Sequence, residues 1–532
     1  MTSLNRILDV LPVFADDVRV QIVFAVSRGS RFGADVPSLL DDLGVRTINW
    51  QQAIEDEFDL IICASDHADL HQLRGPLVLV PHGAGFQKFS PYDRQELAGL
   101  TRSALWHDGA AVPSLVALSH ESQRDLVPEL IDRTAVVGDP ALDLMTALLD
   151  RREQLREDLG VEPAQKLVTV TSTWGPSSLL ARWPTLPAQL LAELPVDEFR
   201  VAAVLHPNVW AAHSSWQIQH WLRTSLSSGL ILLPPAGPWQ VGLAAADCVI
   251  GDHGSLSAYA AGLSIPLVLG AFGSEEVPPD SAVSRLAADV PRLAAGPSLA
   301  GQVRRTIAEA DVQTLARATT DLFARRGQSL SILQQKLYDI LGFAPLRRPV
   351  PRPLPSWQAP AREIRAFHVE TTRLGRSVQV ERFPAALAEF SRSRGSRHLV
   401  AHEDAGEVFL QNSSAIVASR PGDTSARAIL ERYPGCRVVV SDHGADGFVL
   451  TERDNWRTLE ARMVTISPPE PGTTPVEIEP TEMAPGSATG SVIVAATWFY
   501  LLTSEPQATV DVLLAGISNQ VRFSRPVPPD VP

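Results

Sequence analysis

The sequence predicts an α/β protein with two doubly wound, parallel-sheet units followed by a smaller third segment. A chain of 532 residues is too long for one hydrophobic core. Through roughly the first 340 residues, short β-branched runs alternate with amphipathic stretches, which is typical of parallel strands covered by helices on both faces. A proline-rich stretch at residues 345–360 then separates these two units from the rest of the chain.

The first unit, residues 1–150, contains five predicted strands. They are residues 18–26, 59–64, 76–80, 115–119 and 135–138. Apolar residues dominate each of them, as expected for strands that are buried on both faces. A charged helical stretch at residues 143–159 leads from this unit into the next.

The second unit, residues 151–344, repeats the same alternation of apolar runs and amphipathic stretches. Its predicted strands are residues 167–171, 200–205, 230–233, 248–250 and 266–269, and its closing helices are residues 302–325 and 330–341. Open α/β sheets bind ligands at the carboxyl ends of their strands. Two successive sheets of this kind therefore predict a cleft where their strand ends face one another.

The remaining chain consists of a linker and a third segment. Residues 345–360 (PLRRPVPRPLPSWQAP) predict an extended, basic linker. Residues 361–532 predict an additional, smaller α/β domain of unknown role. Its expected strands are residues 408–410, 415–418 and 436–440, its expected buried helix is residues 492–502, and its expected disordered tail is residues 526–532. That apolar helix is shorter than the about 20 residues needed to span a bilayer.

Composition excludes several classes of function. A net charge of −14 opposes non-specific binding to nucleic acid or to an anionic membrane surface. Three widely spaced cysteines without a CxxC pair exclude a disulfide framework and a structural zinc site. The N-terminus lacks the pattern of a signal peptide, so we expect a cytoplasmic protein with no integral membrane segment.

The first of four strand-end motifs is Pro81-His82-Gly83-Ala84-Gly85-Phe86-Gln87-Lys88. A histidine at the carboxyl end of a strand can act as a general base. Glycine lets the backbone approach a ligand closely, and Lys88 can meet a phosphate. The alternative is an ordinary glycine-rich turn with a hydrogen-bonded histidine.

Two further motifs follow strands of the second unit. Ser172-Thr173-Trp174-Gly175 offers hydroxyls and backbone N–H groups that suit phosphate oxygens, or it simply caps the next helix. Leu205-His206-Pro207-Asn208 places a histidine at the rim of the sheet. It is either a functional residue at a strand end or a structural histidine whose hydrogen bonds are satisfied within the fold.

The fourth motif is Asp252-His253-Gly254-Ser255, which opens a predicted helix. The N-terminus of a helix offers free N–H groups and partial positive charge, so it favours an anion. Ser255 can donate its hydroxyl, and Gly254 permits close approach. A plain helix cap by Asp252 or Ser255 is compatible with that role.

In this order the four motifs resemble those of the teichoic-acid glycerophosphotransferases that use CDP-glycerol. That family is a GT-B branch that also holds the UDP-N-acetylglucosamine 2-epimerases. His82-Gly83 with Lys88 looks like its His-Gly motif, Ser172-Thr173-Trp174 is similar to Pro-Thr-Trp, and His206-Pro207-Asn208 matches His-Pro-Asn. Asp252-His253-Gly254-Ser255 is intermediate between Asp-Tyr-Ser-Ser, the form in the glycerophosphotransferases, and Asp-Ser-Gly-Gly, the form in the epimerases.

The resemblance spans roughly residues 18 to 340, and it also includes Val137-Gly138-Asp139-Pro140, which looks like the segment between the lobes. It implies two Rossmann-like lobes, an acceptor lobe and a nucleotide-binding lobe, with His82 and His206 as the catalytic pair. The expected substrate- or phosphate-binding residues are Gly83, Lys88, Ser172, Thr173, Asn208, Asp252, His253, Gly254 and Ser255. Two departures are Ala84, where the family has threonine, and Ala258-Tyr259, near the place of an acidic residue that meets ribose hydroxyls.

These observations predict a transferase that moves a glycerophosphate or sugar unit from a nucleotide-linked donor to a hydroxyl acceptor. No metal or other cofactor is expected. The alternative is a non-catalytic scaffold that binds a nucleotide or nucleotide-sugar and signals to a protein partner through residues 361–532. An epimerase is a weaker reading, because its additional carboxylates are not apparent.

Two other motifs have features of metal sites. Asp66-His67 with Asp69 and His71 has a spacing that can share a metal on one helix face, although a solvated face is favoured. Ser441-Asp442-His443-Gly444 is similar to a metal motif of alkaline-phosphatase-type phosphodiesterases. A strand-to-turn junction is favoured there.

Overall fold

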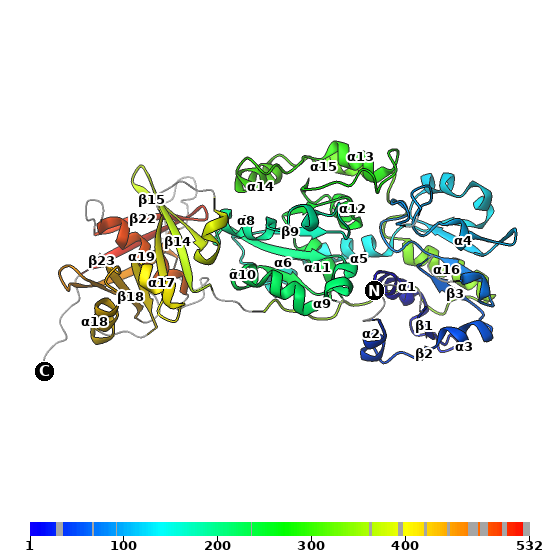
Figure 1. Cartoon of the computed structure of the whole chain (residues 1–532), viewed down its shortest axis with the longest axis horizontal. Helices are drawn as coiled ribbons and strands as arrows, with labels where there is room; N and C mark the ends of the chain where they lie inside the picture. Colours follow the sequence, from blue (N-terminus) through cyan, green and yellow to red (C-terminus); the bar gives the residue numbers. More distant parts are fainter. Residues whose placement is uncertain are drawn as a thin grey trace.

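The computed structural model describes most of the chain. The described residues are 1–27, 36–65, 69–91, 93–235, 237–360, 364–391, 397–419, 423–443, 447–466, 477–478, 488–502 and 508–524. Two α/β lobes and a third, mostly β region follow one another along the long axis of the molecule (Figure 1). The two lobes have separate parallel sheets, as predicted.

The first lobe is built on a four-stranded parallel sheet with strand order β3-β4-β7-β8. Its strands are β3 (Ile61–Cys63), β4 (Leu77–Leu79), β7 (Leu115–Leu118) and β8 (Thr134–Val136). Two short strands, β1 (Phe24–Ala25) and β2 (Thr47–Ile48), form a separate parallel pair. The predicted strand at residues 18–26 is therefore reduced to two residues, and the side chain of Val18 is 96% exposed.

Helices and a small hairpin surround these strands. They are α1 (Thr2–Val10), η1 (Leu11–Phe14), α2 (Val36–Asp42), α3 (Trp50–Glu55), η2 (Leu70–Gln72), α4 (Arg102–Leu105), β5 (Trp106–His107), β6 (Ala110–Ala111), η3 (Glu121–Leu126) and η4 (Pro128–Arg133). The core of the lobe lies on both faces of the four-stranded sheet, because Val78 and Leu79 in adjacent positions of β4 pack into different clusters.

The second lobe has a five-stranded parallel sheet with strand order β11-β10-β9-β12-β13. Its strands are β9 (Lys166–Ser172), β10 (Phe199–Leu205), β11 (Ile231–Leu233), β12 (Cys248–Gly251) and β13 (Leu267–Leu269). The order reverses around β9, so the chain switches direction across the sheet between β11 and β12. This is the switch point at which open α/β sheets bind ligands.

The helices of this lobe cover both faces of the sheet. They are α5 (Pro140–Leu148), η5 (Leu149–Arg151), α6 (Arg152–Asp158), α7 (Leu179–Arg182), α8 (Leu186–Glu193), α9 (Pro207–Trp221), α10 (Arg223–Ser227), α11 (Trp239–Ala244), α12 (Ser255–Gly262) and α13 (Ala282–Asp289). The predicted single helix at residues 302–325 is instead two helices, α14 (Leu299–Ala308) and α15 (Val312–Ala318). Asp311 interrupts it by accepting the Gln313 N–H and so starting a new helix.

The last helix of the second unit crosses back to the first lobe. Leu333, Leu337 and Tyr338 of α16 (Ser329–Leu341) share a core cluster with Val13 and Phe14 of η1. The Tyr338 hydroxyl also donates to Asp17 at 2.8 Å. The two lobes are therefore joined both through α5 and through α16.

The third region is a sheet of ten strands in which β19 pairs with both β18 and β20, so that nine strands close into a ring. Its elements are β14 (Ala366–Leu374), β15 (Ser377–Pro384), η6 (Ala385–Phe390), β16 (Arg397–His402), α17 (Glu407–Asn412), β17 (Ala415–Ala418), α18 (Asp423–Arg432), β18 (Val438–Asp442), β19 (Gly447–Glu452), β20 (Thr458–Ile466), β21 (Glu477–Ile478), α19 (Ala488–Leu502), β22 (Thr509–Leu514) and β23 (Ile517–Ser524). This closed sheet is not the small layered α/β segment predicted from sequence.

Helix α19 lies inside the closed sheet. It contacts strands around the ring, and Val492 to Ala496 are completely buried in one core cluster with residues of β14, β18 and β22. A helix that is apolar on every side needs such an interior position. The buried helix predicted at residues 492–502 is confirmed. Among the described residues, no helix is long and apolar enough to cross a membrane.

One predicted strand of this region is wrong. Residues 408–410 lie in helix α17, where the Asn412 side chain donates to the Val408 carbonyl. A three-residue apolar run cannot by itself distinguish a strand from one helical turn. The strand at Ala415–Ala418 occurs as predicted, and the strand expected at residues 436–440 is shifted to Val438–Asp442.

The third region is fixed to the second lobe. Arg382 of β15 forms an almost fully buried ion pair with Asp197, and the Val196 N–H donates to the Arg382 carbonyl at 2.9 Å. Leu387 of η6 belongs to the core of the second lobe. Residues 345–360 contain no helix or strand, and their Trp357 packs against the second lobe.

Candidate functional site

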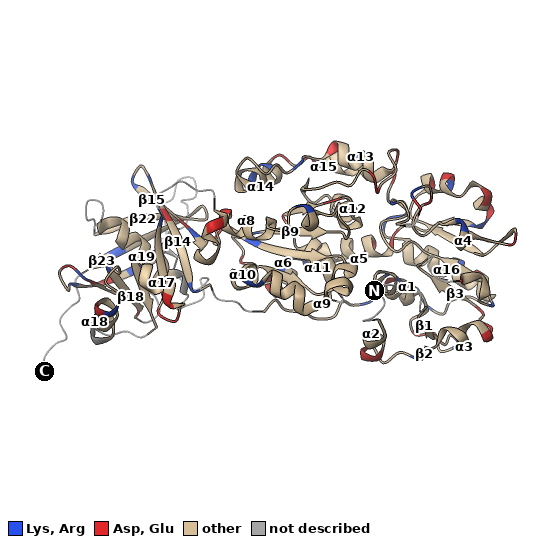
Figure 2. Ribbon diagram, in the orientation of Figure 1, with Lys and Arg blue, Asp and Glu red and all other residues tan. Residues whose placement is uncertain are grey.

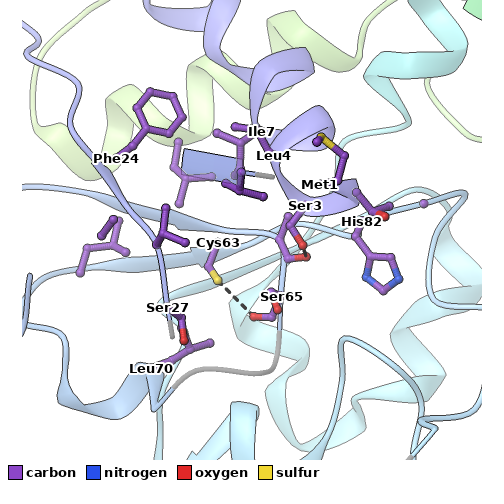
Figure 3. A pocket seen from close by; sticks show the side chains of 18 of the residues that line it. Met1, Ser3, Leu4, Ile7, Phe24, Ser27, Cys63, Ser65, Leu70 and His82 are labelled. Carbon is purple, nitrogen blue, oxygen red and sulfur yellow. Dashed lines mark hydrogen bonds between the residues drawn. The ribbon is translucent and has the colours of Figure 1, made fainter. Parts of the chain in front are cut away.

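A cavity of ≈ 1060 Å³ opens between the lobes and extends into the first one. Most of the predicted site residues reach its wall from opposite lobes. Those on the wall are His82, Gly83, Lys88, Asn208, His206 and Ser255. Figure 3 shows His82 beside Met1 and Ser3 at one end of this cavity. The strand-end motifs of both units therefore converge on one space, as their positions predicted.

The His82-Gly83 loop touches the start of helix α12 in the other lobe. The Ala84 N–H donates to the Ser255 hydroxyl at 3.2 Å. A Cβ atom on Gly83 would lie 2.4 Å from the Ser255 oxygen, so a larger residue would displace the Ser255 hydroxyl. Gly83, which was predicted to let a ligand approach, therefore also lets the two lobes come close.

Lys88 places a cation in this cleft. Its Nζ donates to the Thr173 hydroxyl at 3.0 Å. Burial lowers the pKa of the Lys88 amine, whereas Asp252 and Glu276 oppose that shift. The side chain reaches from the first lobe to the Ser172-Thr173 motif of the second, where it can meet an anion.

His206 is the N-cap of α9. Its Nδ1 accepts the Asn208 N–H at 3.1 Å, so the neutral ring carries its proton on Nε2. Burial lowers the pKa of His206 to about 3, and Lys88 and His82 add to the effect. His206 is therefore a neutral hydrogen-bond donor at physiological pH.

Asp252 organises the loops of the second lobe. Its carboxylate accepts the N–H groups of Thr173 (2.8 Å), Leu179 (2.9 Å) and Gly254 (2.9 Å), and it is 2% exposed. All of these contacts are internal to the lobe and Asp252 does not line the cavity. Asp252 thus positions Thr173 and Gly254, the residue before α12. The N-cap of α12 is Gly254 and no side chain caps the helix, so the alternative of a simple cap by Asp252 or Ser255 is wrong.

Ser172 and Gly254 also position the site from behind its wall. The Ser172 hydroxyl accepts the Leu180 N–H at 3.1 Å and is buried. A Cβ on Gly254 would lie 3.0 Å from an Asp252 oxygen and 3.2 Å from the Thr173 Cβ. Gly254 therefore allows the two loops to pack together.

His253 points away from the cavity. Its Nδ1 accepts the Gly273 N–H at 3.1 Å, and its Nε2 lies 2.9 Å from a carboxylate oxygen of Glu276. The side chain is 1% exposed. Its position next to a glycine in a strand-end motif gave no sign of this orientation, which depends on the loop after β13. His253 holds Glu276 in place.

Sequence analysis missed the carboxylates Glu275 and Glu276, which line the cleft after β13. Burial raises the pKa of Glu276, but its contacts with His253 and Lys88 outweigh burial and lower it overall. Glu275 accepts a hydrogen bond from Ser177. An acidic pair just beyond the carboxyl end of a predicted strand was the available signal.

A buried network at the junction of the lobes was also missed. Arg6 of α1 donates to the Gly83 carbonyl at 2.8 Å, to both Asp139 oxygens at 3.1 Å and to the Tyr259 hydroxyl at 2.7 Å. Asp139, in turn, caps α5 by accepting the Ala141 N–H. Although burial opposes it, Asp139 holds the pKa of Arg6 above its usual range. Arg6 ties the His-Gly loop to both the interlobe segment and α12.

The two possible metal motifs do not assemble a site within the described residues. Asp66, His67 and Gly444 lie outside those residues. His71 stacks on His107 with ring centroids 3.6 Å apart, and Asp442 accepts a hydrogen bond from Ser491 of α19. No group of three or more His, Cys, Asp or Glu side chains in the described part of the chain could hold a metal ion.

No protein-family model and no curated protein matches the sequence. Among solved structures, the wall teichoic acid polymerase TagF is similar with a TM-score of 0.42 and 12% identity, over 63% of this chain and 90% of that chain. UDP-GlcNAc 2-epimerase from Neisseria meningitidis, bound to UDP-GlcNAc, has a TM-score of 0.40 and 11% identity, over 64% and 97%.

The S. aureus MnaA–UDP co-structure has a TM-score of 0.38 and 10% identity, over 63% of this chain and 92% of that chain. These similar structures are GT-B-type enzymes. Both of the families whose motifs the sequence resembles are represented among them.

Proposed function

We propose that this protein is a transferase that moves a glycerophosphate or sugar unit from a nucleotide-linked donor to a hydroxyl acceptor. The observation that carries the proposal is that His82 and His206 reach one cleft from opposite lobes, together with Lys88 and the first turn of α12. A cation, a helix N-terminus and a neutral imidazole donor form an arrangement suited to a phosphate that gains charge during transfer.

The donor phosphates are assigned to the space between Lys88 and α12. Ser255 offers its hydroxyl, and the first backbone N–H groups of α12 carry the partial positive charge of a helix start. Asn208 forms part of the wall on the second lobe, and Thr173, which does not itself line the cavity, holds Lys88 in place. Glu275 and Glu276 supply carboxylates for hydroxyl groups of the donor, in place of the acidic residue that the α12 sequence lacks.

The two histidines receive different roles. Because its Nδ1 already accepts the Asn208 N–H, His206 can only donate through Nε2 in its neutral form, and we assign it to the oxygens of the reacting phosphate. His82 is then the general base, which takes the proton of the acceptor hydroxyl. In the glycerophosphate reaction, the acceptor oxygen bonds to phosphorus, the bond to the nucleotide phosphate breaks, and the nucleoside monophosphate leaves.

The second candidate is a scaffold that binds a nucleotide without turnover. Two observations favour it. Ala258 and Tyr259 stand near the place where the resembled family has an acidic residue. Ser255 already accepts a hydrogen bond from Ala84, and Thr173 accepts one from Lys88. Hydrogen bonds that join the two lobes in this way suit a protein whose conformation changes when a nucleotide binds, and that signals by this change.

Nucleotide release distinguishes the two candidates. The purified chain is incubated with CDP-glycerol or with UDP-sugars and a range of hydroxyl acceptors, and free nucleotide is measured. We expect release by the wild type and its loss in the His82→Ala/His206→Ala double variant. Full-rate release by the double variant would refute the catalytic assignment. Binding of donor by calorimetry without release under any condition would support the scaffold.

A further inference from the structure

The strongest feature that the proposed function does not absorb is the part of the cavity inside the first lobe. Within the described residues, β1 pairs only with β2 and β3 pairs only with β4, so the two sheets of this lobe do not join. Side chains from both sheets and from α1 line the space between them (Figure 3). This space is continuous with the cleft at His82.

Apolar side chains form much of the wall of this inner space. Leu4 and Ile7 of α1 and Phe24 of β1 contribute to it, and Cys63 of β3 also lines it, with its thiol donating to the Ser65 carbonyl at 3.1 Å (Figure 3). Apolar walls of this extent are unfavourable to leave against water, and they favour an apolar occupant. The space also includes Leu70, which extends the same surface.

The inner space is elongated and has polar ends. Residues from Asp59 to Ser65 line it along the whole of β3, a path of roughly 20 Å for six steps of extended chain. Arg19, Glu57 and Asp59 lie at the end where the strands start, and His82 lies where they finish. A chain-like apolar group with a polar head at the His82 end fits this shape.

We propose that this inner space binds the apolar chain of the acceptor, so that the acceptor is an amphiphile with a hydroxyl group at its polar end. The proposal rests on the proposed function in one respect, because the chain would place that hydroxyl beside His82. The transfer itself is unchanged: the hydroxyl proton passes to His82 and the hydroxyl oxygen bonds to the transferred group.

Cys63 makes the binding part of the proposal testable without turnover. It lines the inner space, whereas Cys248 and Cys436 are completely buried. We expect decyl methanethiosulfonate to label Cys63 at least tenfold faster than the charged 2-sulfonatoethyl methanethiosulfonate. Saturating 1-decanol should protect Cys63, glycerol should not, and Cys63→Ser should remove the labelling. Equal rates with both reagents, or no protection by 1-decanol, would overturn the proposal.

A matched pair of variants tests the location. Ile7→Trp fills the inner space, so it should slow labelling by the decyl reagent at least tenfold and weaken the protection by 1-decanol. Ile131→Trp makes the same change at a site that is 52% exposed and outside the cavity, and should leave both unchanged. If Ile7→Trp does not fold, Phe24→Trp replaces it, with circular dichroism as the check. Equal effects of the two tryptophans would contradict the proposal.

Donor turnover separates this proposal from the proposed function. With CDP-glycerol as donor, 1-decanol should stimulate nucleotide release at least tenfold more than glycerol does. Protection of Cys63 without any nucleotide release would contradict the transferase and leave the apolar site in place. Nucleotide release with no protection and no preference for 1-decanol would contradict the apolar site and leave the transferase in place.

Discussion

The imidazole of His206 illustrates how one backbone contact restricts the chemistry of a side chain. Its Nδ1 accepts the Asn208 N–H, and burial lowers its pKa to about 3. The ring therefore stays neutral in the folded protein where a free histidine would take up a proton. Both its charge and its donor direction follow from its place at the start of α9.

The first prediction concerns pH and stability. The pKa of His206 falls from 6.5 in the unfolded chain to about 3 in the fold, so the contribution of this neutral ring is complete above pH 6.5. It is lost as the pH falls from 6.5 towards 3, because only the unfolded chain binds the proton. Between pH 7 and pH 5 we expect a loss on the order of 1–2 kcal/mol in the free energy of unfolding.

Urea titrations at both pH values measure that loss. The variant His206→Asn keeps a capping side chain and removes the titrating ring, so its stability should fall less over the same interval. An identical pH dependence in wild type and His206→Asn would contradict the assignment.

The second prediction concerns turnover. His82→Ala removes the proposed base and His206→Ala removes the proposed donor, so each should lower kcat by about 10²–10⁴-fold. His71→Ala serves as the control, because His71 stacks on His107 outside the cleft. Thermal melting should show that all three variants fold. Equal kcat in His71→Ala and His82→Ala would contradict the role of His82.

The third prediction concerns the anion site. In Ser255→Ala the donor phosphate loses a hydroxyl, and a hydrogen bond to a charged group contributes about 1.5–3 kcal/mol. Donor affinity, measured by calorimetry, should therefore fall by roughly tenfold or more. Ser281→Ala changes a serine at the start of another helix, α13, and should affect stability but not affinity. Unchanged donor affinity in Ser255→Ala would show that the donor phosphate binds elsewhere.

Among single residues, those whose positions follow from strand ends were predictable. His82, Lys88 and His206 each follow a strand directly or within one loop, and the structure brings them to one cavity. Arg6 was not predictable, because its partners Asp139 and Tyr259 are 133 and 253 residues away along the chain. His253 was placed in the right motif, but its side chain turns toward Glu276.

At the scale of elements, continuous apolar runs located the strands of both lobes, because a buried parallel strand needs little besides such a run. The strand predicted at residues 18–26 is the exception. Seven of its nine residues are apolar, yet only Phe24 and Ala25 pair with β2. Whether a segment pairs depends on which strand lies next to it in the fold. The pattern within one segment does not identify that adjacent strand.

The fourth prediction concerns the contact between the His-Gly loop and helix α12. Gly83→Ala places a Cβ 2.4 Å from the Ser255 oxygen, so the Ser255 hydroxyl must leave its position, either by rotation or because the loop and the helix separate. We expect donor binding, measured by calorimetry, to weaken at least tenfold. Gly296→Ala, where a Cβ meets open space, should leave donor binding unchanged. A normal affinity in Gly83→Ala would show that the contact is dispensable.

At the scale of the whole molecule, the third region moves with the second lobe. The two are joined by a buried ion pair, a backbone hydrogen bond and a shared core. Figure 2 shows acidic residues beside α8, where the third region adjoins the second lobe. The order of the two lobes and the linker was predictable from the alternation of strands and helices. The closed sheet was not, because its closure depends on the pairing of β19 with β20 and of β15 with β22, and the second joins strands more than 120 residues apart.

The fifth prediction tests that junction. Asp197→Ala leaves Arg382 buried without its partner, and breaking such a pair costs about 3–5 kcal/mol. Asp454→Ala breaks an exposed pair with Arg437, for which about 0–1 kcal/mol is expected. Denaturant unfolding measures both, and limited proteolysis should release the third region more readily in Asp197→Ala. Equal stabilities would show that the buried pair does not hold the junction.

The proline-rich linker connects two anchors on different bodies. Phe343 packs against Tyr338 and Arg19 of the first lobe, and Trp357 packs against the second. Fourteen steps of polyproline-like chain, at about 3.1 Å each, span about 43 Å. Because a chain cannot stretch beyond its extended length, the length of the linker sets an upper limit on how far the two anchors can separate. The linker thus acts as a tether that limits how far the cleft between the lobes can open while a substrate enters or a product leaves.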